Sequence, residues 1–164
     1  MYAVGIDIGS TSAEALILND EHILAWSILD TGYSSRRAAE LALDEALRQS
    51  GLHRERLGRI VATGYGRVAV DFADRQVTEI SCYARGIHYL FPQVQTVIDI
   101  GGQDSKVVAV GPGGKPLDFA MNDKCAAGTG RFLGAAASTM DLALDDLGPL
   151  SLRGRAPVRI TTVC

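Results

Sequence analysis

Cysteine, histidine and aromatic residues are scarce in this chain of 164 residues. It has three cysteines, three histidines and one tryptophan, and only 6% of its residues are aromatic. Three cysteines are too few, and odd in number, for a disulfide scaffold. The histidines, His22, His53 and His88, are scattered without the spacing of zinc ligands. The sequence therefore excludes a disulfide-stabilised scaffold and predicts no zinc site.

The chain also lacks an excess of positive charge and a long apolar run. A net charge of −3 argues against a nucleic-acid surface, and no stretch approaches the roughly 20 apolar residues that cross a bilayer. The first residues enter a strand-like pattern at once, so we expect no signal peptide, no membrane contact and a cytoplasmic location. With 47% hydrophobic residues and 18 glycines, the composition is that of a globular domain with a core.

One pattern occurs twice, 92 residues apart, which is the separation of Asp7 and Asp99. Residues 5–12 and 97–104 each combine an apolar run, an aspartate and a glycine turn, and a second apolar run follows each. This order predicts two β-hairpins with an acidic residue at the end of the first strand. We expect a third strand after each hairpin, at residues 22–29 and 117–121.

The remaining segments alternate between helical and strand patterns, which predicts an α/β fold with a mixed sheet. Ser34 or Ser35 should cap a helix that ends at Gly51. The apolar positions of this helix include Ala38, Leu41, Ala42 and Ala46. Further elements are expected as a strand at 59–62 and helices at 78–89, 129–140 and 141–147. We predict two domains, 1–93 and 94–164. A strand-like run at 157–163 leads directly to Cys164, and we expect a fragment of a longer protein.

The glycine turns predict a phosphate clamp. Backbone N–H groups and hydroxyls in two facing turns could hold a polyphosphate, while Asp7 and Asp99 would hold Mg²⁺ through water. Gln103 or Asp104 could orient an attacking water. A single copy would be read as an ordinary turn, and the glycine patterns match neither a P-loop nor a dinucleotide fingerprint. The expected phosphate-binding residues are Gly9, Ser10, Thr11, Ser12, Gly101, Gly102 and Lys106.

Cys125 precedes a glycine-bearing turn that opens a helix, within residues 121–131. Free N–H groups at a helix start favour the thiolate, the form that attacks or binds a metal. The alternative is a small buried apolar residue. Cys82, among Ile80, Ala84 and Ile87 at helical spacing, is interpreted as a packing residue.

The motifs described above resemble those of a known family. The paired Asp-Ile-Gly hairpins are similar to the phosphate motifs of the acetate kinase, sugar kinase, Hsp70 and actin superfamily, which implies a ribonuclease H-like ATPase fold. More closely, the chain resembles the activators of 2-hydroxyacyl-CoA dehydratases and the ATPase subunits of benzoyl-CoA reductases. Five segments carry this resemblance: residues 5–12, 62–67, 78–82, 96–106 and 121–132.

The resemblance implies a homodimer that binds ATP or ADP with Mg²⁺ and shares one 4Fe-4S cluster. The matching ligands are Cys125 and Cys164 of each protomer. ATP hydrolysis would drive the transfer of an electron from reduced ferredoxin or flavodoxin to a dehydratase of the component D type, or to an aryl-CoA reductase. The number of cysteines agrees independently with a shared cluster, because a 4Fe-4S cluster takes four thiolates and two chains can give two each.

One residue departs from the family pattern. The first hairpin usually carries a lysine where this chain has Glu14. An acid there would repel phosphate and weaken ATP hydrolysis, unless its side chain faces away. Two other readings stay open at this stage: a sugar-kinase-like phosphotransferase without a cluster, and a non-catalytic scaffold that binds cluster or nucleotide.

Overall fold

The computed structural model describes residues 1–157, which divide into two compact units. Unit 1 comprises Met1–Val97 and Val108–Asp118, and unit 2 comprises Ile98–Val107 and the chain from Phe119 on. The domain boundary expected near residue 94 stays a prediction. Most of the strand-like run expected at 157–163, together with Cys164, lies outside the described residues.

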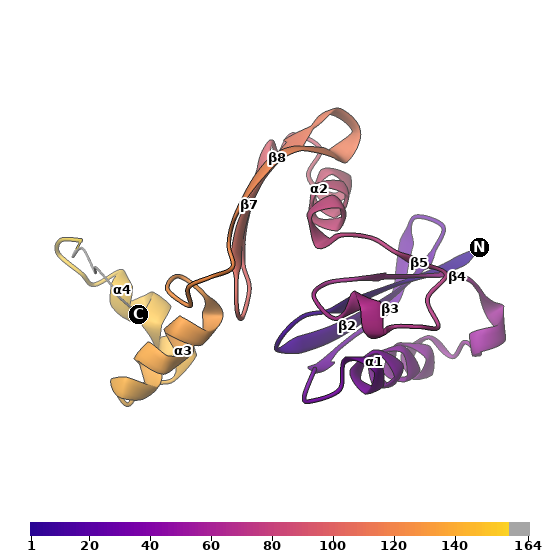
Figure 1. The fold of residues 1–164 in the computed structure, drawn as a ribbon, viewed down its shortest axis with the longest axis horizontal. Coiled ribbons are helices and arrows are strands. Elements are labelled where there is room, and N and C mark those ends of the chain that lie inside the picture. The colour runs from indigo at the N-terminus through magenta and orange to yellow at the C-terminus, as the bar shows by residue number, and fades with distance from the viewer. Residues whose placement is uncertain (158–164) are drawn as a thin grey trace. The chain divides into compact units, whose positions relative to one another are not determined.

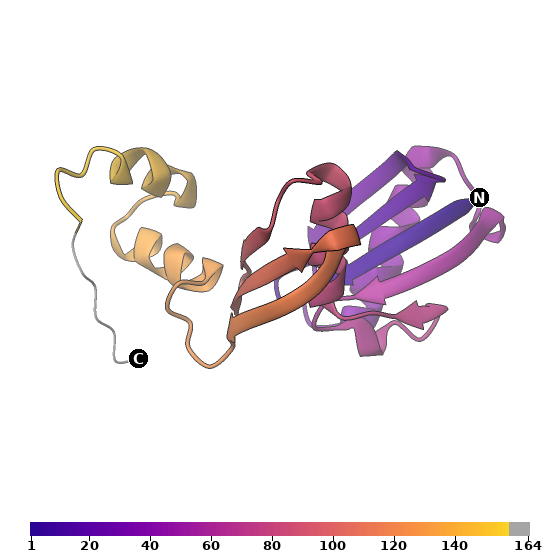
Figure 2. The same ribbon diagram turned by 90° about the horizontal axis from the view of Figure 1, so that it is seen from above.

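Unit 1 is built on a five-stranded mixed sheet (Figures 1 and 2). Hairpin connections make β1–β2 and β2–β3 antiparallel, whereas β4 returns through a helix and pairs with β1 in parallel, as does β5 with β4. The mixed sheet predicted from the sequence is therefore confirmed. In spatial order the strands are β3 (His22–Asp30), β2 (Ser12–Asn19), β1 (Tyr2–Ile8), β4 (Leu57–Thr63) and β5 (Arg75–Gln76).

The helix α1 (Ser35–Ser50) packs on one face of this sheet (Figure 1). Ser34 caps its start by accepting a hydrogen bond from the Arg37 backbone N–H, and Gly51 ends it in a left-handed conformation, φ 67°. Leu41, one of the apolar residues of this helix, is exposed, and the side chains that face the sheet form a neighbouring stripe. That stripe consists of Ala38, Ala39, Ala42, Leu43, Ala46 and Leu47.

Alternation along the strands assigns the two faces of the sheet. Ile6, Ile8, Ala13, Ala15 and Ile17 are fully buried under α1, so the residues between them belong to the opposite face. That opposite face carries Asp7 and Glu14, which are described below.

The remaining elements follow the predicted order. A second apolar cluster joins Ala84 of α2 (Glu79–Leu90) to Val108 and Val110. The strands β6 (Thr96–Ile100), β7 (Ser105–Gly111) and β8 (Lys115–Asn122) form a three-stranded sheet in chain order. Short 3-10 helices lie at Arg54–Arg56, Arg67–Ala69, Pro112–Gly114 and Leu144–Asp146. Among the described residues, no helix is long and apolar enough to cross a membrane.

Unit 2 contains α3 (Gly130–Thr139) and the short α4 (Leu147–Ser151). The helix predicted at 141–147 is wrong. Asp141 has a left-handed backbone, φ 55°, and the Leu142 N–H returns to the Ala137 carbonyl at 2.9 Å, which closes the end of α3. The chain then restarts as a 3-10 turn, Leu144–Asp146, that leads into α4.

Candidate functional site

The two predicted hairpins have the same turn. In the first, the Gly9 N–H donates to the Ser12 carbonyl at 2.8 Å, and in the second the Gly101 N–H donates to the Asp104 carbonyl at 2.9 Å. These residue pairs are equivalent in the 92-residue repeat. A Cβ at Gly9 would lie 3.1 Å from the Ser12 carbonyl, and one at Gly101 would lie 3.1 Å from the Asp104 carbonyl. Glycine thus lets both turns close tightly, which confirms the repeated hairpin.

Asp7 in the first hairpin lies against a glycine turn that follows β4. Gly64 has φ +84°, and a Cβ on it would overlap both the Asp7 carboxylate and the Ile8 backbone. The Gly66 N–H donates to the Ile8 carbonyl at 2.8 Å, and the Arg67 guanidinium donates to the Gly64 carbonyl at 2.9 Å. The glycine-rich segment after β4 is therefore a support that fixes the end of β1.

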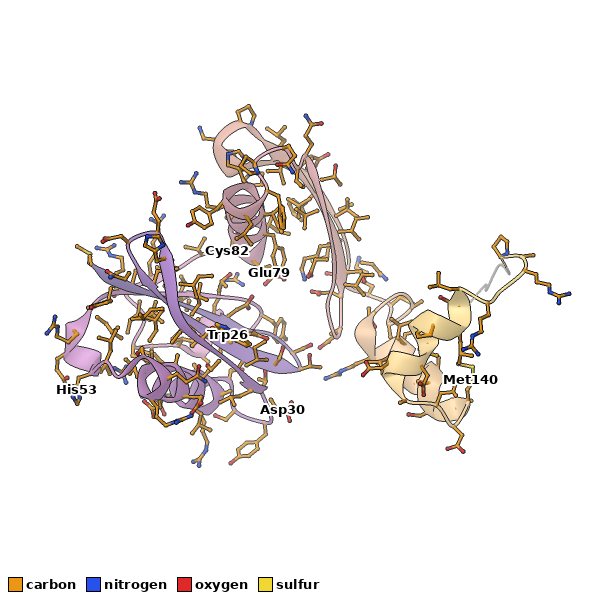
Figure 3. All side chains as sticks on the ribbon, turned by 180° about the vertical axis from the view of Figure 1, so that it is seen from behind. Trp26, Asp30, His53, Glu79, Cys82 and Met140 are labelled. Carbon is orange, nitrogen blue, oxygen red and sulfur yellow. The ribbon has the colours of Figure 1, made fainter. Side chains whose placement is uncertain are left out.

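Glu14 shares the sheet face of Asp7. It is the direct cross-strand partner of Asp7 in the antiparallel β1–β2 pair, and Thr63 is the partner of Asp7 on the parallel strand β4. All three residues line a cavity of about 240 Å³ that is also bordered by Cys82 of α2. Glu14 and Asp7 therefore lie on the same face of the sheet, while the orientation of Glu14 towards bound phosphate stays a prediction. Figure 3 labels Cys82 and Glu79 on α2, and Trp26 on the sheet.

The second hairpin holds a buried lysine between two carboxylates. The side chain of Lys106 is only 4% exposed, and its Nζ lies 2.5 Å from Asp104 Oδ1 and 3.7 Å from Asp99 Oδ2. Asp99 Oδ2 is buried and makes no hydrogen bond within the described residues. A buried carboxylate oxygen of this kind suits a water-coordinated Mg²⁺. Gln103 is exposed at the tip of the turn.

Local hydrogen bonds order the loop that carries Cys125. The Asn122 side-chain amide donates to the carbonyls of Cys125 and Ala127, at 3.0 and 3.2 Å. The Thr129 hydroxyl donates to the Ala126 carbonyl at 2.6 Å and caps α3 by accepting from the Phe132 N–H. Cys125 itself is half-exposed. A partly exposed thiol in an ordered loop before a helix suits a metal ligand better than a core residue.

The start of α3 is bonded to the turn of the second hairpin. The Gly130 N–H donates to the Gly101 carbonyl at 2.8 Å, and the Arg131 N–H donates to the Gly102 carbonyl at 3.1 Å. Sequence reasoning missed this link, because main-chain bonds between segments about 30 residues apart leave no residue signature. Within unit 2, the candidate phosphate turn and the cysteine loop are therefore joined through backbone atoms.

The structure groups the predicted site residues into two sets. Unit 1 holds Asp7, Gly9, Ser10, Thr11 and Ser12 on one hairpin. Unit 2 holds Cys125 and the turn residues Gly101, Gly102, Gln103, Asp104 and Lys106, with Asp99 at the base of the turn. Across residues 1–157 no group of three or more histidine, cysteine or acidic side chains is gathered for a metal. Cys125 would therefore need ligands from outside this set, and Cys164 lies beyond the described residues.

Comparisons of the sequence with family models and with known proteins point to the same family. The model of the BadF/BadG/BcrA/BcrD ATPase family matches residues 4–164. The chain is 44% identical to the activator of lactoyl-CoA dehydratase from Anaerotignum propionicum over 165 residues, which is 100% of this chain and 63% of that protein. At 27% identity it also matches one of the subunits of benzoyl-CoA reductase from Thauera aromatica, over 98% of this chain and 58% of that protein.

Two solved structures are similar over the whole chain. One is component A of (R)-2-hydroxyglutaryl-CoA dehydratase from Acidaminococcus fermentans, with a TM-score of 0.91 at 40% identity. The other is the activator of 2-hydroxyisocaproyl-CoA dehydratase from Clostridium difficile with bound ADPNP, with a TM-score of 0.89 at 41% identity. Both alignments cover 100% of this chain, and 63% and 61% of those proteins respectively. The chain therefore spans less than two thirds of their length.

Remoter structures show the fold alone. The ethanolamine utilization protein EutJ from Carboxydothermus hydrogenoformans, at 14% identity over 92% of this chain and 61% of its own, has a TM-score of 0.59. The ROK hexokinase from Thermus thermophilus, at 16% identity over 94% of this chain and 70% of its own, has a TM-score of 0.54. The predicted ribonuclease H-like ATPase fold, of the actin, Hsp70 and sugar-kinase type, is confirmed.

Proposed function

The chain belongs to the BadF/BadG/BcrA/BcrD ATPase family, and from that membership we propose that it acts as an ATP-driven activator. It would deliver a low-potential electron to a 2-hydroxyacyl-CoA dehydratase. Relatives at 41–44% identity are named as activators of such dehydratases, which supports this partner. The expected resemblance to the activator family is thereby confirmed, while the activity and the partner are proposals.

The observation that carries the proposal is the link between Gly101 and Gly130. Nucleotide phosphates would occupy the hairpin turn, and the helix that follows Cys125 begins on that same turn. A change at the turn on hydrolysis would therefore reach the cysteine loop through two backbone hydrogen bonds. This arrangement suits a protein that couples ATP to events at a thiolate site, and a simple phosphotransferase has no need of it.

The roles of the individual residues follow the two hairpins. The turn N–H groups would bind phosphate oxygens, and Asp7 and Asp99 would hold Mg²⁺ through its water shell. Gln103 or Asp104 would orient the attacking water. Lys106, held between two carboxylates, would fix the second turn and offset its negative charge.

Cys125 would supply one thiolate for a 4Fe-4S cluster, and Cys164 the second, from each of two chains. When bound, the cluster supplies a one-electron carrier. The positive end of α3 lies just after Cys125, so it would stabilise an anionic group there. A homodimer, reduced ferredoxin or flavodoxin as donor, and a cytoplasmic location stay predictions.

An aryl-CoA reductase is the second candidate partner. The benzoyl-CoA reductase relative matches nearly the whole chain, but at 27% identity it is more distant than the dehydratase activators. The dehydratase therefore ranks first.

Anaerobic reconstitution with iron and sulfide tests the proposal. We expect a brown dimer with about two iron atoms per chain, and electron transfer to a 2-hydroxyacyl-CoA dehydratase that requires ATP. The Cys125→Ser variant should be colourless, while Cys82→Ser, which changes the other described thiol, should keep its iron. An iron-free protein that still hydrolyses ATP or phosphorylates a sugar would refute the proposal and favour the kinase-like reading.

A further inference from the structure

Ser105 connects the turn of the second hairpin to the loop that carries Cys125. It directly follows Asp104, the last residue of that turn, and its hydroxyl donates to the Gly128 carbonyl at 2.8 Å. Ser105, Gly128 and Cys125 all belong to unit 2. We propose that Ser105 is a positioning residue. Its hydroxyl holds the cysteine loop, residues 123–129, to the candidate phosphate turn, and it makes the exposure of Cys125 depend on what occupies that turn.

The residues on both sides of Ser105 are fixed by their own contacts. On one side, the Asp104 carbonyl accepts from the Gly101 N–H at 2.9 Å, which closes the turn. On the other side, the Lys106 side chain is 4% exposed, and its Nζ lies 2.5 Å from Asp104 Oδ1. A hydroxyl has only one proton to donate, and that of Ser105 is directed at Gly128. The turn therefore sets the position of this donor.

The acceptor belongs to the peptide unit that joins the cysteine loop to α3. Gly128 has φ +79°, and the N–H of the same peptide unit, on Thr129, donates to the Ala126 carbonyl at 3.0 Å. A peptide unit is planar, so its carbonyl and its N–H cannot turn independently. Ser105 on one side and Ala126 on the other therefore set the orientation of this peptide unit, which follows Cys125 closely in the chain.

The Ser105 bond differs from the two backbone bonds that join the same turn to α3. Those bonds come from Gly130 and Arg131 at the start of the helix, whereas the Ser105 bond ends on the loop before the helix. The Asn122 amide also orders this loop, through two of its carbonyls, but it does so from the strand β8. Ser105 therefore holds the loop to the turn, while Asn122 holds it to β8.

The first hairpin shows that the turn itself does not need this hydroxyl. The 92-residue repeat places Ala13 at the position of Ser105, and the first turn closes through the same bond, from the Gly9 N–H to the Ser12 carbonyl at 2.8 Å. Ala13 is fully buried and has no side-chain donor. The hydroxyl of Ser105 therefore serves the contact with the cysteine loop, and Ser105→Ala should leave the second turn closed.

The dependence on the occupant of the turn rests on the proposed function, which places nucleotide phosphates there. A ligand bound to the turn stabilises the arrangement of the turn that binds it. Because Ser105 follows the turn directly, that stabilisation would reach the Gly128 carbonyl and hold the loop more firmly. Cys125, which is partly exposed, would then react more slowly with a thiol reagent while nucleotide is bound.

Hydrogen exchange and thiol labelling test the role of Ser105 without nucleotide. In the full chain, exchange of the Thr129 amide is measured by NMR, and alkylation of Cys125 by iodoacetamide is measured by peptide mass spectrometry. Ser105→Ala should raise both rates about two- to tenfold, the usual effect of losing one hydrogen bond. Ser105→Thr, which keeps the hydroxyl, should match the unaltered chain, as should the control Ser138→Ala at an exposed position of α3.

Cys82 in unit 1 serves as the internal control, because its alkylation should not change in Ser105→Ala. Equal rates at Thr129 and Cys125 in Ser105→Ala and in the unaltered chain would overturn the proposal. A rise at Cys82 as large as that at Cys125 would mean a general loss of structure and would also overturn the local role.

The ATP analogue ADPNP tests the dependence on the turn. Saturating ADPNP with Mg²⁺ should slow the alkylation of Cys125 severalfold in the unaltered chain and have little effect in Ser105→Ala, which should still bind ADPNP. Asn122→Ala loosens the loop from β8 but keeps the Ser105 bond, so it should be labelled faster and still be protected by ADPNP. Equal protection in Ser105→Ala, as direct shielding of Cys125 would give, would overturn the coupling. If ADPNP does not bind to the unaltered chain, the proposed function fails, and the rates without nucleotide still decide the role of Ser105.

Discussion

The backbone N–H of Gly130 donates to the carbonyl oxygen of Gly101 across 2.8 Å, so α3 starts on the turn of the second hairpin. The N–H of Arg131 adds a bond to the Gly102 carbonyl at 3.1 Å. The first N–H groups of a helix have no acceptor within the helix, and here two of them find one on the turn. The turn and the helix therefore cannot be displaced independently without breaking these bonds.

Thr129 holds this junction together, which gives the first prediction. Its fully buried hydroxyl caps α3 and donates to the Ala126 carbonyl. Thr129→Ala should lower the free energy of unfolding by about 1–2 kcal/mol, measured by urea denaturation. The matched change Thr139→Ala, at the exposed end of the same helix, should cost about 0.5 kcal/mol or less. Equal losses from the two variants would show that Thr129 does not fix the junction.

The second prediction concerns Lys106. Lys106→Met leaves Asp99 and Asp104 facing one another without their shared cation, and should destabilise the protein by about 3–5 kcal/mol. Lys115→Met, at an exposed lysine of β8, should change the stability by no more than about 0.5 kcal/mol. Adding Asp104→Asn to Lys106→Met should recover part of the loss in a double-mutant cycle. Strictly additive effects would argue against the ion pair.

Gly64 and Gly86 should respond oppositely to the same substitution. A Cβ at Gly64 would overlap the Asp7 carboxylate, and φ +84° is unfavourable for alanine, so Gly64→Ala should lower the melting temperature markedly. Gly86 lies within α2, and a Cβ there would meet nothing within 4 Å. Gly86→Ala should therefore stabilise the protein by about 0.5–1 kcal/mol. If Gly64→Ala were neutral, the close approach to Asp7 would be wrong.

Glu45 on α1 gives a prediction about pH. The Arg48 guanidinium donates to both oxygens of the Glu45 carboxylate, Gln49 donates to one of them, and these bonds lower the pKa of Glu45 from 4.5 to about 2. Because the folded pKa lies below the unfolded value, this contribution to stability is present above pH 4.5 and is lost as the pH falls through about 2. An NMR titration of the carboxylate measures the pKa. Arg48→Ala should raise it towards 4.5, and a value near 4.5 in the unaltered chain would contradict the contact.

Local patterns were enough to predict the hairpins and α1. The glycine turns at Gly9 and Gly101, and the capping pair Ser34 and Gly51, act over a few residues and leave a readable signal. The helix expected at 141–147 failed for a local reason as well. The left-handed Asp141 ends α3, and an aspartate gives no sure sign that it adopts this conformation.

The parts of the site that depend on long-range register could not be predicted. Local sequence patterns do not show how far β4 is shifted along β1 in the parallel pair. The position of Thr63 beside Asp7 is therefore known only from the strand register. For the same reason, Glu14 could be recognised as a departure from the family while the face it occupies stayed open. Cys82 borders the cavity, which is consistent with its interpretation as a packing residue, but helical spacing alone does not say which side of α2 meets the sheet.

The junction between the second hairpin and α3 is made of main-chain atoms, and this affects how the protein can evolve. Most substitutions change only side chains, so the bonds at Gly130 and Arg131 can persist while the surrounding residues drift. Proline at position 131 would remove one donor outright, because proline has no N–H. Insertions or deletions in residues 123–129, between the end of β8 and the start of α3, would shift the remaining pairing. Chain length in this interval should therefore be held more strictly than residue identity.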